Sequence, residues 1–383
     1  MIPLERVEAA FEQRETDRVP IHHISFSSEI ASALLGREAY VGGGIQQWRE
    51  VQALWAGEEA HREFLERSFQ DALDIALLCE HDIVRPSYWR YRVKPTERID
   101  AYTFLFAHGQ EEDWRVLRYD PASEQCHIFD YRPRGQRTLE ALERQVAAEE
   151  RAVEDYRPGE AHFAFEIRAQ RLLGAERAVR VGGVEVGLPL QETEVWLEAL
   201  LLRPDLVARH LDVQVERARR NLEFLVPLGF RYFFGGTDFA SNEGPMYSPR
   251  LFRELVLPRV RQVSELCHRQ GVYHLFASDG NLWPVAEDLF GRSGLDGYFE
   301  IDRRAGMDLG TLRERFPHLT LIGNISSHTA HRGSRQEVIE ETLSCLEEAK
   351  RRRGIIVGVS NCLVPGTPVE NVVAILETIR EFR

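Results

Sequence analysis

The sequence predicts an α/β protein built as a (β/α)8 TIM barrel. Short apolar runs alternate with longer amphipathic stretches along the chain, which is the pattern of repeated strand–helix units. Eight such runs can be counted, and the later ones are short and evenly spaced, which favours a closed barrel over an open, doubly wound sheet. The 383 residues suffice for one large barrel that carries an insertion.

Each strand is expected where an apolar run rich in β-branched or aromatic residues is bounded by charged or turn residues. The eight expected strands are residues 19–24, 82–85, 178–188, 231–234, 272–276, 297–301, 319–322 and 354–359. Helices are expected between the later strands, over residues 249–270, 283–290, 334–350 and 368–382. Ser248, Ser334 and Thr367 stand at the expected N-cap positions, where a hydroxyl can accept a hydrogen bond from the first turn.

One region interrupts this repeat after the second strand. Residues 87–135 are rich in aromatic side chains, including Tyr88 and Trp89, and residues 113–119 alternate in the manner of a β-hairpin. A charged helix is expected to follow over residues 137–156. We therefore expect a single barrel domain over 1–383 with an insertion at 87–160, which is either a lid over one mouth of the barrel or a surface hairpin.

Charge and cysteine content narrow the class of function. The formal net charge of −13 argues against nucleic acid or an anionic membrane as the main partner. No apolar run reaches the length of a membrane span, and the charged N-terminal segment lacks the apolar core of a signal peptide. The five cysteines are scattered, which predicts a reducing compartment and a cytoplasmic protein.

Polar side chains follow nearly every late strand, at the end of a barrel where catalytic groups gather. Taken singly, a strand histidine or a lone cysteine is more often a buried structural residue. Their joint placement at strand ends is what predicts an active site. The candidates are Asp238, His274, Asp279, Glu300, Asn324 and Cys362, joined by His22 on the first strand.

Several motifs make the chain resemble the uroporphyrinogen decarboxylase superfamily, and within it the branch that includes corrinoid-dependent methyltransferases. The motifs are TDRVPIHH (16–23), GGTDFASNEGPMYSPRLFRELVLPRVRQV (235–263), HLFASDGNLWPVAEDLF (274–290), LIGNISSHTAHRGSRQEV (321–338) and VSNCLVPGTPVENVVAILE (359–377). This resemblance implies the barrel fold and covers most of the chain, residues 87–160 matching least.

The methyltransferase branch implies a zinc site that activates a thiol substrate. Its ligand pattern is His-x-Cys on one strand, an acidic residue on the next and a Cys after the last. Here His274, Glu300 and Cys362 fit that pattern, while Phe276 stands where the second thiolate is expected. Three ligands and one open position would suit a catalytic zinc ion, with Asp279 as a possible substitute ligand.

The resemblance leaves three functions open. The first is methyl transfer between a small methylated compound and a corrinoid or thiol acceptor, with a corrinoid protein as partner; Asp238 and Asp279 would orient substrate or move protons, and Asn324 would donate a hydrogen bond. The second is decarboxylation, although the arginines that true uroporphyrinogen decarboxylases carry after the first strand are missing at 22–26. The third is a barrel that binds a corrinoid or small molecule without catalysis.

Overall fold

The predicted (β/α)8 barrel is confirmed. The computed structural model describes residues 1–383 except 87–89, 92, 108–113, 133–137 and 190–192. Five of the barrel strands form one parallel sheet in the order β12-β11-β10-β9-β8. These strands are β8 (Tyr232–Gly236), β9 (Tyr273–Ala277), β10 (Gly297–Phe299), β11 (Thr320–Ile322) and β12 (Ile355–Ile356).

The first three strands close the barrel with shorter ladders. Strand β2 (Ile83–Val84) pairs in parallel with β7 (Ala178–Val179), and the next residues join β8, where the Phe234 amide donates to the Val181 carbonyl at 2.8 Å. Residues 19–24 bridge β12 and β2: His22 N donates to Val357 O at 2.9 Å, and Asp82 N donates to Ile21 O at 2.8 Å. Beyond them, β1 (Ser25–Phe26) pairs with β13 (Cys362–Leu363).

The barrel interior holds its own apolar cluster, plugged at the amino-terminal end by α1 (Pro3–Phe11). The ring of Phe11 lies 5.0 Å from that of Tyr232 and 4.6 Å from that of Tyr273. Because α1 occupies this end, the opposite end, where the strands finish, is the one left for chemistry. The inward-facing apolar residues of the strands are Ile24, Ile83, Ala178, Tyr232, Phe234, Leu275, Ala277, Phe299, Ile322 and Ile356.

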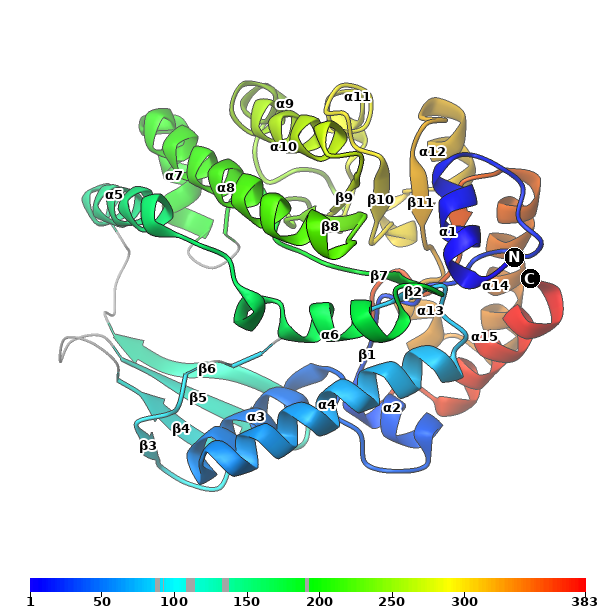
Figure 1. Ribbon diagram of the computed structural model, residues 1–383, viewed down its shortest axis with the longest axis horizontal. Helices are drawn as coiled ribbons and strands as arrows, with labels where there is room; N and C mark the ends of the chain where they lie inside the picture. The colour runs from blue at the N-terminus through cyan, green and yellow to red at the C-terminus, as the bar shows by residue number, and fades with distance from the viewer. Residues whose placement is uncertain (87–89, 92, 108–113, 133–137, 190–192) are drawn as a thin grey trace.

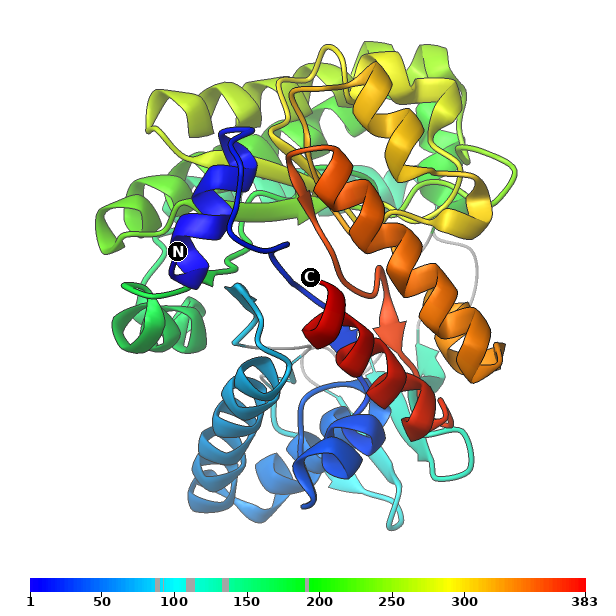
Figure 2. The same ribbon diagram turned by 90° about the vertical axis from the view of Figure 1, so that its right-hand side faces the viewer.

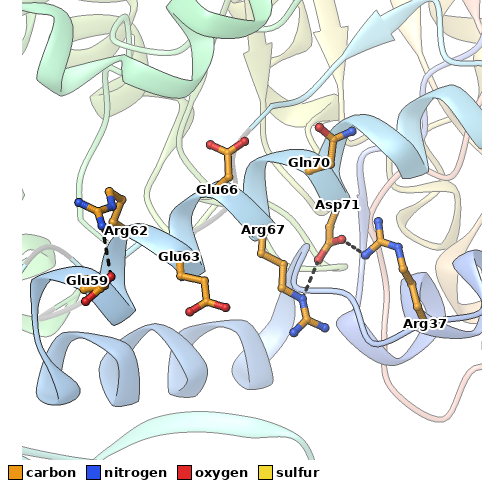
Figure 3. A pocket seen from close by; sticks show the side chains of 8 residues that line it. All are labelled: Arg37, Glu59, Arg62, Glu63, Glu66, Arg67, Gln70 and Asp71. Carbon is orange, nitrogen blue, oxygen red and sulfur yellow. Dashed lines mark hydrogen bonds and ion pairs between the residues drawn. The ribbon is translucent and has the colours of Figure 1, made fainter.

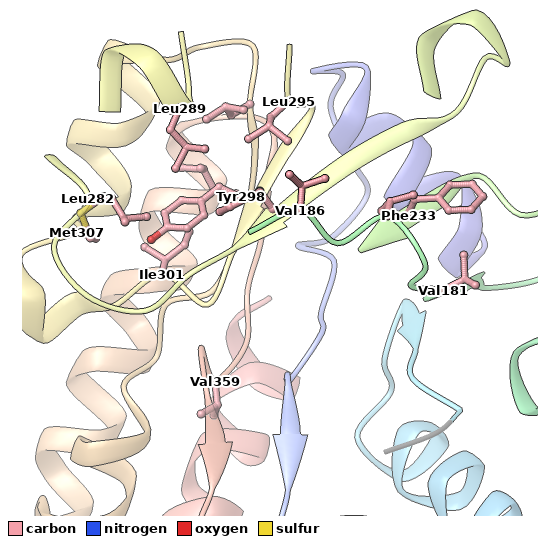
Figure 4. Close-up of a cluster of buried hydrophobic side chains, with 14 of the residues drawn as sticks. Val181, Val186, Phe233, Leu282, Leu289, Leu295, Tyr298, Ile301, Met307 and Val359 are labelled. Atoms are coloured by element: carbon pink, nitrogen blue, oxygen red, sulfur yellow. The ribbon is translucent and has the colours of Figure 1, made fainter. Parts of the chain in front are cut away.

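A larger apolar layer lies between the outward faces of the strands and the surrounding helices. Figure 4 shows part of it, with Tyr298 and Ile301 packed against Leu282 and Leu289. Figures 1 and 2 show helices surrounding the strands. Besides α1, the helices are α2 (Ser28–Leu35), α3 (Gly43–Ala56), α4 (Glu58–Leu78), α5 (Leu139–Asp155), α6 (Ala164–Leu173), α7 (Thr193–Leu202), α8 (Pro204–Leu225), α9 (Pro249–Leu251), α10 (Leu257–Arg269), α11 (Ala286–Leu289), α12 (Leu309–Arg315), α13 (Ser327–Arg332), α14 (Arg335–Arg351) and α15 (Val369–Phe382).

The insertion after the second strand is a four-stranded antiparallel sheet, in the order β3-β4-β5-β6. It packs on α3, with Val51 of that helix buried against Phe104 and Leu117 (Figure 1). The strands are β3 (Glu97–Arg98), β4 (Thr103–Phe106), β5 (Trp114–Asp120) and β6 (Gln125–Arg132). The expected hairpin therefore exists as β5 and β6, while Tyr88, Trp89 and residue 113 lie outside the described residues. Its role as a lid stays a prediction.

Most expected element positions agree with the structure. Ser248 accepts a hydrogen bond from Leu251 N at 3.3 Å, and Ser334 caps α14. Two details were wrong. The third strand ends near Val181 rather than at 188, and the hydroxyl of Thr367 donates to the Val364 carbonyl instead of capping α15. Among the described residues, no helix is both long and apolar enough to cross a membrane.

Candidate active site at the carboxyl ends of the strands

Three predicted carboxylates meet where β8, β9 and β10 end. The Asp279 amide donates to Asp238 Oδ1 at 2.9 Å, which joins the loops after β8 and β9. Asp238, Asp279 and Glu300 are all half-buried. The negative charges of Glu300 and Asp238 both act on Asp279, so the three carboxylates share one electrostatic environment.

Glycines allow the two loops to come this close. Gly236 has φ of +108°, and a Cβ there would lie 2.3 Å from the backbone of Ala277. Gly280 has φ of +88°, and a Cβ there would lie 2.6 Å from the Ala240 carbonyl oxygen. Any other residue at these two positions would push apart the loops that carry Asp238 and Asp279.

Asp279 is the group best suited to carry a proton. Burial raises the pKa of its carboxyl to about 7, and the charges of Glu300 and Asp238 add to that rise. The side chain of Asn361 acts in the opposite sense, since its Nδ2 donates to Asp279 Oδ2 at 2.6 Å and favours the ionised form. A carboxyl with a pKa near neutrality can both donate and accept a proton under ordinary conditions.

Glu300 owes its position to an unusual backbone conformation. Its φ is +62°, in the left-handed region that residues other than glycine seldom adopt. The preceding residue, Phe299, faces the barrel interior, so a regular strand would turn Glu300 outward. The left-handed turn breaks this alternation. Burial raises the pKa of Glu300, while the charge of Arg180 opposes that rise.

Two arginines from the second and third strands, Arg85 and Arg180, act on Glu300 through their charges and were not among the predicted site residues. The Arg180 guanidinium lies 4.7 Å from the Phe234 ring centroid and 4.8 Å from that of Phe299. Arg85 ends the second strand, and its Nη1 donates to Ile24 O at 3.0 Å. The available signal was an arginine within or directly after a short apolar strand, where charged residues are rare unless paired.

His22 lies inside the barrel beside Arg85 and Arg180, as the sequence predicted for a site residue. Its Nδ1 hydrogen-bonds to the Ile83 carbonyl at 2.9 Å, and its ring centroid is 6.1 Å from that of Phe234. Burial, together with the charge of Arg180, holds the pKa of His22 well below its usual value. The imidazole is therefore neutral near pH 7.

Cys362 lies at the edge of the same region, in β13. Its thiol is half-buried, and burial raises its pKa, while a hydrogen bond with Ser25 and the charge of Arg85 act against that rise. Its sulfur lies 3.7 Å from the Leu363 carbonyl oxygen. The neighbouring Asn361, rather than Cys362, contacts the carboxylate cluster directly through Asp279.

His274 and Asn324 do not join the site, so the prediction that every candidate converges is wrong for these two. His274 alternates with the inward-facing Leu275 and points at α10, where its Nδ1 lies 2.9 Å from Ser264 Oγ. Asn324 also faces the helices: its Nδ2 donates to the Met307 carbonyl at 2.9 Å, and the Cys345 thiol donates to its Oδ1. Both side chains are used in packing between strand and helix.

The predicted zinc ligands therefore do not fit. His274 lies outside the barrel wall, whereas Glu300 acts with the carboxylates at its mouth. Within the described part of the chain, no three histidine, cysteine, aspartate or glutamate side chains are arranged to hold a metal ion. Phe276, expected beside the metal, packs in the outer apolar layer instead, 6.4 Å from the Phe239 ring.

A groove of about 700 Å³ lies elsewhere, along α4 (Figure 3). Ion pairs join Arg37 and Arg67 to Asp71 at one end of it, and Arg62 pairs with Glu59 at the other. None of the strand-end residues lines this groove. The Arg62–Glu59 pair is exposed and contributes little to stability, whereas the buried Asp71 also accepts from Tyr40 N and so fixes the local fold.

Comparisons with known proteins agree with this architecture. The family model described as uroporphyrinogen decarboxylase (URO-D) matches residues 186–382. A curated uroporphyrinogen decarboxylase from Anaeromyxobacter sp. (strain Fw109-5) is 30% identical over 132 residues, which are 34% of this chain and 36% of that protein. A methyltransferase from Methanosarcina mazei has a similar structure, with a TM-score of 0.63 and 18% identity over 100% of this chain and 99% of that one. At this identity the likeness concerns the fold alone.

Proposed function

The chain belongs to the uroporphyrinogen decarboxylase family, and on this premise we propose that it is an enzyme that moves a methyl group from a small methylated compound to a nucleophilic acceptor. The observation that carries the proposal is Asp279, a carboxyl of raised pKa at the barrel mouth. The methyltransferase from Methanosarcina mazei, which spans the same fold over its full length, supports this choice of reaction.

In the proposed step, the acceptor's electron pair forms a bond to the methyl carbon as the bond from that carbon to its heteroatom breaks. The Asp279 proton passes to the heteroatom, which would otherwise leave as an anion. Asp238 holds the Asp279 backbone and Asn361 holds its carboxylate, so the donor is fixed in position. A corrinoid carried by a partner protein, or a thiol, would supply the nucleophile; no step is assigned to zinc.

Decarboxylation is the second candidate, and the arginines favour it. Arg85 and Arg180 give the site a positive charge, although residues 22–26 contain no arginine. They could hold a substrate carboxylate while a second carboxylate leaves as carbon dioxide. Asp279 would then protonate the carbon left with the electron pair. The curated decarboxylase that matches part of the chain supports this alternative.

One experiment separates the candidates. The protein is incubated with methyl-labelled ethers and amines together with reduced cobalamin or a thiol, and separately with carboxyl-labelled acids. Methyl transfer yields labelled acceptor detected by NMR, whereas decarboxylation yields labelled carbon dioxide. Either activity should fall at least 100-fold in Asp279→Asn, roughly the contribution of one general acid. Cobalamin binding without either product would favour a non-catalytic binding protein and contradict both enzymatic proposals.

A further inference from the structure

Arg85, Arg180 and His22 surround one side of the barrel mouth. Arg180 and His22 both approach Phe234, the guanidinium at 4.7 Å and the imidazole ring at 6.1 Å. Arg85 is fixed beside them by its bond to Ile24 O, and its charge also acts on His22. Three strands that are distant in sequence thus bring these groups together, opposite the carboxylates of β8 to β10.

The arginines have the form of a preorganised anion site. Two aromatic rings hold the planar Arg180 guanidinium, which limits its rotation, and both arginines are half-buried, so part of each remains accessible to solvent. A guanidinium can form two parallel hydrogen bonds to a carboxylate, which adds directional selectivity to charge attraction. The positive charges of Arg85 and Arg180 both act on the Glu300 carboxylate, which carries the opposite charge.

His22 adds a second requirement. A carbonyl oxygen can only accept a hydrogen bond, so the contact with Ile83 O places the proton on Nδ1 and leaves a lone pair on Nε2. This Nε2 is buried and has no hydrogen-bond partner among the described residues. A buried acceptor without a donor is unfavourable, so a ligand that brings an O–H or N–H group would satisfy it.

We propose that Arg85, Arg180 and His22 form a substrate subsite that selects a carboxylate with a neighbouring hydroxyl or N–H group. The carboxylate binds the guanidinium groups, and the neighbouring donor bonds to His22 Nε2. The rest of the substrate then extends toward Asp279. This inference rests on the proposed function only in placing a small-molecule substrate at the strand ends.

Three probes test both requirements by isothermal titration. Lactate carries a carboxylate and a hydroxyl, propionate lacks the hydroxyl, and lactamide lacks the charge. Wild-type protein should bind lactate about tenfold more tightly than lactamide, because a charge-assisted hydrogen bond is lost. The preference for lactate over propionate should be about fivefold, as expected for one neutral hydrogen bond.

The variants assign each preference to its residue. Arg180→Gln should abolish the preference for lactate over lactamide, and Arg180→Lys should retain part of it. His22→Phe should abolish the preference for lactate over propionate, whereas His22→Gln, which keeps an acceptor oxygen, should preserve some of it. Arg231→Gln is the matched control, an exposed arginine before β8, and should change neither preference. Circular dichroism confirms that each variant is folded.

The outcomes also separate this inference from the proposed reaction. Asp279→Asn should lose turnover and keep both binding preferences. Equal affinity of wild-type protein for the three probes, or no detectable binding of any, would overturn the subsite even if methyl transfer were found. Preferences that survive in both Arg180→Gln and His22→Phe would overturn it as well.

Discussion

The two halves of the barrel are built differently. From β8 to β12 the strands form one continuous parallel ladder. Between residues 19 and 181 the ladders of the barrel strands are only about two residues long. Side chains complete them: the Asp82 carboxylate accepts from Ile21 N, and His23 Nδ1 accepts from Val359 N at 3.0 Å. We call the part with β8 to β12 the regular half and residues 19–181 the irregular half. The family model begins at residue 186 and so matches the regular half.

The halves also carry opposite charges to the mouth of the barrel. The regular half supplies the carboxylates Asp238, Asp279 and Glu300, and the irregular half supplies Arg85 and Arg180. We therefore expect the late strands to supply the proton donor and the early strands to bind the substrate.

Replacing the proton donor should have the largest effect. Asp279→Asn should reduce activity about 10²- to 10⁴-fold, because an amide cannot supply the proton. The pKa of Asp279 is raised to about 7, so the protonated form is lost as pH rises above that value. Wild-type activity should therefore fall about tenfold per pH unit above pH 7. Asp212→Asn, at an exposed ion pair, is the control, and an alkaline limb that persists in Asp279→Asn would refute the assignment.

The early half should depend on its side chains for stability. Asp82→Ala should lower the free energy of unfolding by about 2–3 kcal/mol, because the buried Ile21 N–H loses its acceptor and Arg6 keeps only the more exposed Asp17 as a partner. The matched variant in the late half is Asp288→Ala. Asp288 is also buried, but its partners Arg253 and Arg292 are largely exposed, so the loss should be about 1 kcal/mol. Urea unfolding measures both, and equal losses would remove the contrast.

His274 should act in packing and not as a ligand. His274→Ala should lower the free energy of unfolding by about 1–3 kcal/mol, since it removes a buried ring and its bond to Ser264. Zinc content, measured by elemental analysis after exposure to the metal, should be the same in wild type, His274→Ala and Cys362→Ser. Loss of bound zinc in both variants would restore the original ligand assignment.

Buried histidines should make the early half sensitive to acid. Burial lowers the pKa of His23 to about 4, and the pKa values of His22 and His81 are lowered as well. Between about pH 6.5 and 4 the unfolded chain binds more protons than the folded one, so stability falls as pH falls.

Each such histidine adds a slope of up to about 1.4 kcal/mol per pH unit to this loss. His23→Gln should make the slope shallower when unfolding is measured at pH 7, 6 and 5. His328→Gln, at an exposed histidine, should leave it unchanged. If the slope were the same in His23→Gln and in the wild type, His23 would not contribute to the acid sensitivity.

Part of the site could be predicted because strand ends are visible in the sequence. Asp238 and Asp279 follow apolar runs and stand close to glycines, and parallel strands deliver such residues to one rim. Arg85 and Arg180 were equally visible as charges at short apolar strands, yet nothing in their spacing showed that they would face Glu300. Their meeting depends on barrel closure through ladders of two residues.

The class of fold, the order of strands and helices, the Ser248 and Ser334 caps and the family resemblance could all be predicted from the amino-acid sequence. Each of these follows from local periodicity or local motifs. The face of the barrel to which each strand residue points depends on tertiary packing. Both faces of a barrel strand are apolar, so the run around His274 contains no sign of which side points inward. The left-handed turn at Glu300 likewise overrides alternation, because packing at the barrel mouth holds a conformation that the residue itself does not favour.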